Sequence, residues 1–345
     1  MEQNRKDYLD ILRALAAVGV IVIHVSSNNW FGYIGSFNWI VFTIYEGIAR
    51  ISVPIFFMIS GSLLLSKIYS IKKIYLNKIL RLCVFLIVWS IIYKLVNLPK
   101  DGDILYKLLT AAKEIINGNT QMHLWFVYAI IGLYIITPIL SIFVNNCEKK
   151  ILLYAIISCF ILGSFCEFIN QFQNLAFINN NFNKIKAGYA VGYIGYFLLG
   201  YYLDKYDIER AKKYILYVLG VMSTILTIVL VIKDCFTYQN FVERFWTYTM
   251  PFIVISSCAW FVFVKNISNK FNRTIQIILR NISEKSLGIY AVHFLFITFL
   301  WNHGITTFLF NGILSVPVIS AIVFFCSYLT SSLVQKIPKI GKYLA

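Results

Sequence analysis

The stretch that decides the fold is RALAAVGVIVIHVSSNNW, residues 13–30. An arginine is followed by ten uncharged residues and then by a histidine, His24. A helix of about 20 mostly apolar residues is long enough to cross the hydrocarbon core of a bilayer. The stretch therefore predicts a first membrane-spanning helix. Because ionisable groups in hydrocarbon are costly and usually mark a site, His24 also makes this helix a candidate functional element.

The composition of the whole chain is that of an integral membrane protein. Of its 345 residues, 59% are hydrophobic and only 13% are charged, whereas soluble domains carry about 25% charged residues. The mean hydropathy is +0.73. A soluble protein would need more polar residues to cover its surface. The composition excludes a soluble globular protein and predicts one membrane-embedded domain over residues 1–345.

Ten apolar segments are candidates for membrane-spanning helices. Their runs are long and lack the alternation of a β-barrel strand. We therefore expect an all-α integral membrane protein, a bundle of about ten transmembrane helices. The segments lie near residues 8–27, 39–66, 79–97, 123–144, 151–169, 188–203, 214–232, 247–264, 286–302 and 312–335.

The positive charges orient this bundle. An even number of spans places both termini on one side, and that side receives most of the 31 Lys and Arg residues. The positive-inside rule then predicts a multi-pass plasma membrane protein with cytoplasmic N- and C-termini. Topology and contact with anionic membrane lipids explain the net charge of +16, so no nucleic-acid partner is expected. The polar outer loops 98–122 and 170–187 are either solvated connectors or the mouth of a site for a hydroxylated acceptor.

The seven cysteines show no CxxC or zinc-ligand spacing. Neither a disulfide framework nor a metal site is expected from them. The sequence carries no signal for an oligomeric state.

Three ionisable residues are predicted to lie at similar depth in the outer part of the membrane. A helical rise of about 1.5 Å per residue puts His24 about 24 Å into the first span. Glu46 and Arg50 lie on the returning second span, about 10 Å and about 16 Å from the outer surface by the same rise. These two residues are four apart, so they share a helix face and can pair. Two interpretations are open. The three residues form a catalytic group, or Glu46 and Arg50 form a neutralised ion pair and His24 is a hydrogen-bonded packing residue.

Histidine suits general-base or nucleophilic work because its ordinary pKa lies near neutrality. Arg13 lies eleven residues before His24, about three helical turns towards the cytoplasm. By itself Arg13 is typical of a side chain that extends to the interface. Together with Lys78 and Arg81, at the inner start of the third span, it would form a clamp for phosphate groups.

Four segments resemble the helices of one family. Arg13 and His24, with ten residues between them, resemble the Arg-x10-His motif of the acyltransferase-3 family, whose integral membrane enzymes acylate polysaccharides and other acceptors. RISVPIFFMISGSLLL (50–65) is similar to the family's second helix and LGIYAVHFLF (287–296) to its penultimate span. HLWFVYAIIGLYIITPIL (123–140) resembles the fourth span of the surface-polysaccharide O-acetyltransferase branch. The resemblance covers nearly the whole chain.

The resemblance implies an acyl-CoA-dependent O-acyltransferase, with acetyl-CoA as the expected donor and no metal. The phosphates of the donor would bind near Arg13, Lys78 and Arg81, although the family often has Arg-x-x-Arg where this chain has Lys78-x-x-Arg81. Lysine keeps the charge but lacks the planar fork of arginine. The thioester would reach His24, which would act as general base or carry the acyl group. The groups that would position the reactants are Glu46 and Arg50.

The acceptor implied by the resemblance is an extracytoplasmic or lipid-linked carbohydrate. His123 and Trp125 are candidates for its mouth, since an aromatic ring beside polar groups suits stacking on a sugar. The alternative for Trp125 is the aromatic belt of the membrane interface. Tyr290 and His293 in the ninth span are further substrate-binding candidates.

Two rival functions belong to other classes. A transporter or flippase for a polysaccharide precursor would line its path with the same polar residues, although no internal repeat or pair of matched broken helices supports it. A haem or lipid sensor would use histidines as ligands, and His24 and His123 could face each other near the outer side.

Overall fold

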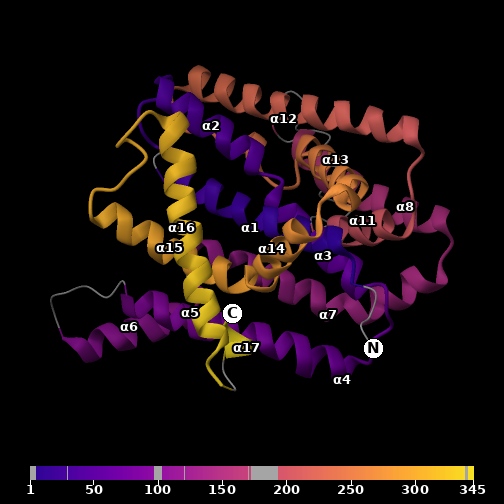
Figure 1. Cartoon of the computed structure of the whole chain (residues 1–345), viewed down its shortest axis with the longest axis horizontal. Helices are drawn as coiled ribbons and strands as arrows, with labels where there is room; N and C mark the ends of the chain where they lie inside the picture. The colour runs from indigo at the N-terminus through magenta and orange to yellow at the C-terminus, as the bar shows by residue number, and fades with distance from the viewer. Residues whose placement is uncertain are drawn as a thin grey trace.

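The computed structural model describes residues 5–28, 30–96, 103–119, 121–169, 171, 193–338 and 341–345. In these residues the regular elements are all helices (Figure 1), which confirms the all-α prediction. The predicted loop 170–187 lies outside the described residues except for Gln171. The helices are α1 Asp7–Ser27, α2 Phe37–Ala49, α3 Ser52–Leu64, α4 Ile71–Ile74, α5 Leu80–Val96, α6 Ile104–Ile116, α7 Trp125–Asn146, α8 Lys149–Phe160, α9 Cys166–Ile169, α11 Tyr193–Lys205, α12 Arg210–Tyr238, α13 Pro251–Ile267, α14 Arg273–Glu284, α15 Ser286–Asn302, α16 Gly312–Gln335 and α17 Gly341–Leu344.

Eight helical stretches among the described residues are long and apolar enough to cross a membrane. Two further predicted spans are represented by shorter helices, α15 with 17 residues and α11 with 13 residues. The start of the predicted span 188–203 lies outside the described residues. The structure therefore supports a multi-pass protein and does not confirm the count of ten. The eight stretches are Asp7–Ser27, Phe37–Leu64, Ile71–Val96, Met122–Asn146, Lys149–Ile169, Arg210–Tyr238, Arg244–Lys270 and Gly312–Gln335.

Helix α1 lies at the centre of the bundle (Figure 1). It packs against α2, α3, α13, α14, α15 and α16. Its side chains Leu12, Ile21 and Val25 are at most 1% exposed. Because α1 carries both Arg13 and His24, the helices around it decide what these two residues can reach.

The predicted second span is broken into α2 and α3 at Arg50 and Ile51. Pro54 lies four residues after Arg50 and has no N–H group to bond to the Arg50 carbonyl, and its ring clashes with a carbonyl at that position. The break places Arg50 at a bend within the membrane-spanning stretch Phe37–Leu64.

The prediction that residues 98–122 form a simple polar connector is wrong, because this segment contains α6. Asp103 caps this helix by accepting a hydrogen bond from the backbone N–H of Leu105 at 3.1 Å. The apolar residues Leu105, Leu108 and Leu109 recur at helical spacing, and all three are exposed. Lys94 of α5 and Glu114 of α6 form an ion pair at 2.5 Å, so α6 is tied to the bundle.

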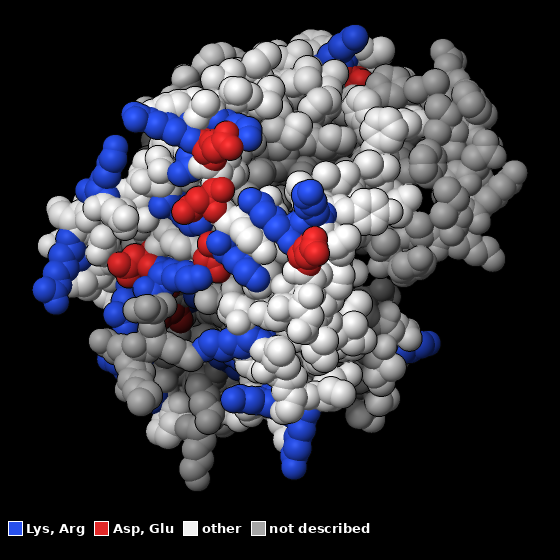
Figure 2. All heavy atoms as spheres, turned by 90° about the vertical axis from the view of Figure 1, so that its right-hand side faces the viewer, with Lys and Arg blue, Asp and Glu red and all other residues white. Residues whose placement is uncertain are grey.

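Charged side chains gather at one end of the bundle. This is the end where α11 is joined to α12 and toward which the N-terminus lies (Figure 1). Figure 2 looks onto this end and shows many Lys and Arg side chains there, with fewer Asp and Glu. We call it the basic end. Cations on one face of a bundle are the feature that the positive-inside rule uses to predict the cytoplasmic side.

Helices α3 and α11 pack backbone to backbone through two glycines. A Cβ atom on Gly61 would lie 1.8 Å from the carbonyl oxygen of Phe197, and one on Gly200 would lie 2.0 Å from that of Met58. Small residues allow such close approach of membrane helices, where van der Waals contact is a main source of association energy. This contact positions Tyr193, at the start of α11, beside Phe57 with ring centroids 4.3 Å apart.

We predict that Gly61→Ala destabilises the protein by about 1–3 kcal/mol, because the backbones of α3 and α11 must separate. The matched control is Gly132→Ala in α7, where an added Cβ meets no atom within 4 Å. The control should be neutral or stabilising by up to about 1 kcal/mol, because alanine favours the helix. Thermal melts in detergent compare the two variants, and equal melting temperatures would contradict the proposed packing.

Candidate active site

Three of the four histidines of the chain converge inside the bundle. They are His24 near the end of α1, His123 in the turn Met122–Leu124 before α7, and His293 in α15. The His293 ring centroid lies 5.1 Å from that of His24 and 5.2 Å from that of His123. The His24 and His123 centroids are 6.2 Å apart. We call these residues the histidine cluster.

Two tyrosines hold the helices that carry the histidine cluster. The Tyr290 hydroxyl donates a hydrogen bond to the backbone carbonyl of His123. The Tyr93 hydroxyl, on α5, donates to the carbonyl of Ala291 at 2.7 Å, and its ring lies 5.0 Å from the His123 ring. The Tyr290 hydroxyl thus contacts the backbone of His123, and its role in substrate binding stays a prediction.

The nitrogens of the cluster have few partners in the protein. His293 Nδ1 lies 2.7 Å from the carbonyl oxygen of Tyr290, so in the neutral ring Nδ1 carries the proton and Nε2 is the acceptor. Within the described residues, His293 Nε2 and both ring nitrogens of His123 are buried without a hydrogen-bond partner. Such atoms are rare because leaving them unpaired is unfavourable, and they often mark a functional site.

His24 differs from the other two histidines in its access to the surroundings. His123 is 2% exposed and His293 is fully buried, whereas His24 is partly exposed. Of the three imidazole rings, that of His24 is therefore the most accessible to a substrate that enters the site. Among the described residues no set of three or more His, Cys, Asp or Glu is arranged to hold a metal ion.

The predicted ion pair of Glu46 and Arg50 is present beside this cluster. Arg50 Nη1 lies 2.8 Å from Glu46 Oε1, and the Glu46 side chain is 3% exposed. Arg50 Nε also donates to the carbonyl of Trp246 at 2.9 Å. The guanidinium is close enough to His24 for the two to interact electrostatically. The predicted pairing is thus confirmed, and the depths of these residues in the membrane stay a prediction.

Aromatic rings surround Arg50. Its guanidinium lies 5.1 Å from the ring of Trp246 and 4.9 Å from that of Tyr248, within the range of cation–π attraction. Trp125 stacks on Tyr248 with centroids 5.7 Å apart and lies 5.6 Å from Tyr193. Trp125 therefore joins an aromatic group inside the bundle, next to Arg50, as well as lying at the start of a span.

The three cations predicted to bind phosphate also come together. Lys78 lies close enough to Arg81 and Arg13 for their like charges to interact. Arg13 Nη1 donates to the Ser283 hydroxyl at 3.3 Å and lies 3.9 Å from Asp10 Oδ1. A π-helical turn, Tyr75–Ile79, contains Lys78, and such turns often occur at functional sites. We call Arg13, Lys78 and Arg81 the cation cluster.

The two clusters share one face of α1. Eleven residues at about 100° each bring His24 to within about 20° of the direction of Arg13, at a distance of about 16 Å along the axis. The residues between them on this face, Ala17 and Val20, are small and buried. One helix therefore presents a cation near its start and an imidazole near its end in the same direction.

The comparison with protein families assigns the chain to a family. Residues 6–332 match the family model described as an acyltransferase domain, that of acyltransferase-3. The chain belongs to the acyltransferase-3 family. No curated protein and no solved structure matches the chain. The matched range contains both clusters, so each belongs to the acyltransferase-3 domain.

Sequence reasoning missed several neighbours of the candidate site. Tyr93, Tyr193 and the neighbours Trp246 and Tyr248 come from three segments far apart in the chain. In a chain with 17% aromatic residues, no local pattern singles them out. Their part in the site follows from their contacts with His123, Trp125 and Arg50.

We predict that Glu46→Leu destabilises the protein by about 3–5 kcal/mol, because it leaves a buried guanidinium without its carboxylate. The double variant Glu46→Leu/Arg50→Leu should recover part of this loss, because neither charge is then left alone. Thermal melts in detergent measure both effects.

The control for this prediction is Glu209→Leu, which breaks the exposed pair of Glu209 and Lys212. Exposed pairs contribute only about 0–1 kcal/mol, so this variant should melt close to the wild type. A Glu46→Leu protein as stable as the control would contradict the claim that the buried guanidinium of Arg50 depends on its carboxylate partner.

Proposed function

We propose that the protein is an acyl-CoA-dependent O-acyltransferase of the plasma membrane. It would move an acyl group, with acetyl as the expected one, to a hydroxyl of an extracytoplasmic or lipid-linked carbohydrate. The observation that carries this proposal is the placement of Arg13 and His24 on one face of α1. Arg13 belongs to the cation cluster, and His24 belongs to the histidine cluster. Within the family, we expect the protein to belong to the surface-polysaccharide O-acetyltransferase branch.

The cation cluster suits the donor end of the reaction. Coenzyme A carries phosphates, and arginine binds phosphate through a planar, bidentate fork while lysine acts as a point charge. Arg13, Lys78 and Arg81 lie toward the basic end, which this proposal assigns to the cytoplasm together with both termini. The distance of about 16 Å from Arg13 to His24 is the length that the pantetheine arm would have to cover.

The histidine cluster suits the transfer itself. His24 would take the proton from the acceptor hydroxyl, and the oxygen would attack the thioester carbonyl. The tetrahedral intermediate would then expel the CoA thiolate, which takes the proton from His24 and leaves as free CoA. His293 Nε2, an acceptor in the neutral ring, would receive a hydrogen bond from His24 and orient it.

Arg50, positioned by Glu46, would stabilise the negative charge that develops in this step. A fixed guanidinium near the reacting carbonyl would stabilise the oxyanion of the intermediate. Glu46 would hold the guanidinium in place through the pair at 2.8 Å. His123 and the ring of Trp125, beside Tyr193 and Tyr248, would contact the acceptor.

The second possibility for His24 is transient acylation. Its nitrogen would attack the thioester, release CoA and then pass the acyl group to the acceptor hydroxyl. The two routes differ in one measurable respect. An acyl-imidazole route releases CoA stoichiometric with enzyme before any acceptor is added, whereas the general-base route releases it only with acceptor.

We predict that His24→Ala lowers acyl transfer by about 10²–10⁴-fold, the typical contribution of a positioned acid or base. The assay is transfer of the radiolabelled acetyl group of acetyl-CoA by protein in proteoliposomes that contain the carbohydrate acceptor. The control is His303→Ala, which removes the exposed fourth histidine at the end of α15. Turnover that is equal in the two variants would remove His24 from the mechanism.

We predict that Arg13→Gln raises the KM for acetyl-CoA at least about tenfold, equivalent to about 1.4 kcal/mol, and changes kcat little. The reason is the loss of one phosphate contact. With acetyl-pantetheine, a donor that lacks the nucleotide phosphates, Arg13→Gln and wild type should behave alike. Lys150→Gln, an exposed cation outside the cluster, is the control. An equal effect of Arg13→Gln on both donors would contradict the phosphate role.

A further inference from the structure

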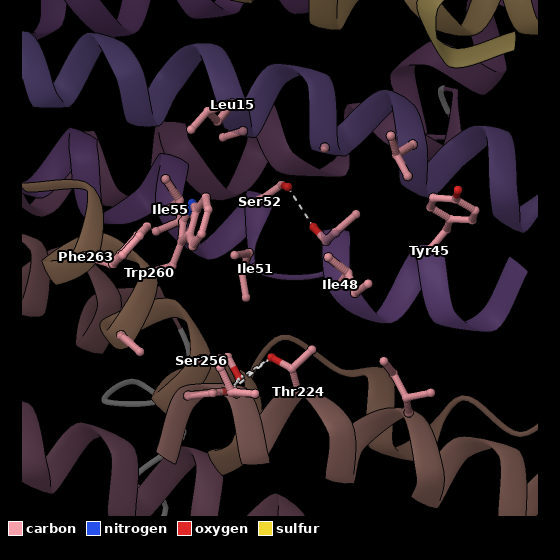
Figure 3. A pocket seen from close by; sticks show the side chains of 18 of the residues that line it. Leu15, Tyr45, Ile48, Ile51, Ser52, Ile55, Thr224, Ser256, Trp260 and Phe263 are labelled. Carbon is pink, nitrogen blue, oxygen red and sulfur yellow. Dashed lines mark hydrogen bonds between the residues drawn. The ribbon is translucent and has the colours of Figure 1, made fainter. Parts of the chain in front are cut away.

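A large cavity lies on the face of α1 that is turned away from both clusters. Its volume is about 950 Å³, and residues of α1, α2, α3, α12 and α13 line it. Figure 3 shows it with Leu15 of α1 on one side and Thr224 of α12 on the other. On α1 the lining residue Val22 lies about 180° around the helix from Arg13, at about 100° per residue. The cavity is therefore separate from the candidate active site.

The wall of this cavity is apolar even where hydroxyl groups face it. Ser52 donates to the carbonyl of Ala49 at 2.7 Å. Thr224 donates to the carbonyl of Gly220 at 3.0 Å, and its oxygen lies 3.1 Å from that of Ser256 (Figure 3). These hydroxyl groups already have partners in the protein. A polar ligand would lose its hydrogen bonds to water on entering, so the cavity suits a hydrocarbon chain.

The position of the cavity indicates that such a hydrocarbon chain comes from the bilayer. Helices α1, α2, α3, α12 and α13 all belong to stretches that can cross the membrane. Its lining residues Ile48, Val221 and Ile225 are 55%, 62% and 55% exposed, so the cavity opens at the surface that meets the bilayer. Along α12 the lining runs from Tyr217 to Val229, about 18 Å at about 1.5 Å per residue. This length is comparable with one leaflet, half of the hydrocarbon core of about 30 Å.

Polar groups lie at the basic end of the cavity. The Tyr217 hydroxyl is buried without a hydrogen-bond partner among the described residues. One turn earlier on α12, Lys213 lines a second pocket of about 230 Å³ that also contains Lys265 and Asn266. Lys265 is paired with Asp207 at 3.0 Å, and Lys213 donates to Asn266 Oδ1 at 3.5 Å. With two lysines and one acidic residue, this pocket has one positive charge in excess. The combination of a long apolar cavity with a cation at one end matches a lipid that carries a phosphate.

We propose that this cavity binds one anionic glycerophospholipid of the surrounding bilayer. One acyl chain lies along α12 between α1 and α13, and the phosphate lies at Lys213. The Tyr217 hydroxyl donates to an ester carbonyl of the lipid. The bound chain fills the space between the α1–α3 group and the α12–α13 pair, and it joins them. The site is independent of the acyl transfer proposed above.

The test is native mass spectrometry of the protein after exchange into detergent with equimolar dioleoyl phosphatidylglycerol and phosphatidylcholine. The wild type should retain one phosphatidylglycerol. Val221→Trp fills the cavity and should reduce retention at least tenfold. Val218→Trp, on the same helix and 59% exposed but outside the lining, should retain the lipid. Leu15→Trp fills the cavity from the opposite wall and should repeat the loss.

The headgroup is tested by a second pair of variants. Lys213→Gln should retain one lipid but lose the preference for phosphatidylglycerol. Lys212→Gln, whose cation is exposed and paired with Glu209, should keep that preference. Equal retention by Val221→Trp and Val218→Trp, with both proteins folded, overturns the cavity site. A wild type without preference for either lipid overturns the contact at Lys213. Acyl transfer is not part of the readout, so the outcome does not depend on the proposed reaction.

Discussion

The cost of an ionisable side chain in hydrocarbon governs how this bundle is built. Glu46 is 2% exposed, and its carboxylate lies 2.8 Å from Arg50 Nη1. The guanidinium in turn meets a backbone carbonyl and two aromatic rings. The histidines meet the same cost differently, because a neutral imidazole can be buried with less penalty than a charge. Glu46, Arg50 and the three buried or partly buried histidines therefore lie close to one another, and this gathering produces the candidate site.

The bend between α2 and α3 is a second consequence of local chemistry. Pro54 cannot bond to the carbonyl of Arg50, so the helix breaks at the residue that carries the charge. Beyond the bend, Gly61 and Gly200 bring α3 and α11 into backbone contact. That contact sets the place of Tyr193, and through its ring that of Trp125. A proline and two glycines thus position the aromatic group around Arg50 although none of them belongs to the site.

Helix α1 divides the molecule into two functional sides. One face carries Arg13 and His24, which define the proposed route from an anionic donor to the place of transfer. The opposite face carries Leu15 and Val22, which line the apolar cavity. A helix at the centre of the bundle can serve both roles because its residues repeat at about 100°. The family assignment over residues 6–332 applies to this whole arrangement and favours an acyltransferase over a transporter.

The sequence by itself determined the class of the protein, the position of most spans and the pairing within single helices. Glu46 with Arg50, and Arg13 with His24, could be placed because the helical period relates residues on one helix without reference to any other. Only the tertiary structure decided that His293 lies 5.1 Å from His24 and that Tyr290 holds His123. It also revealed α6 within a predicted loop. Contacts between helices depend on their rotation and tilt, which side-chain packing sets and which no periodicity in a single segment encodes.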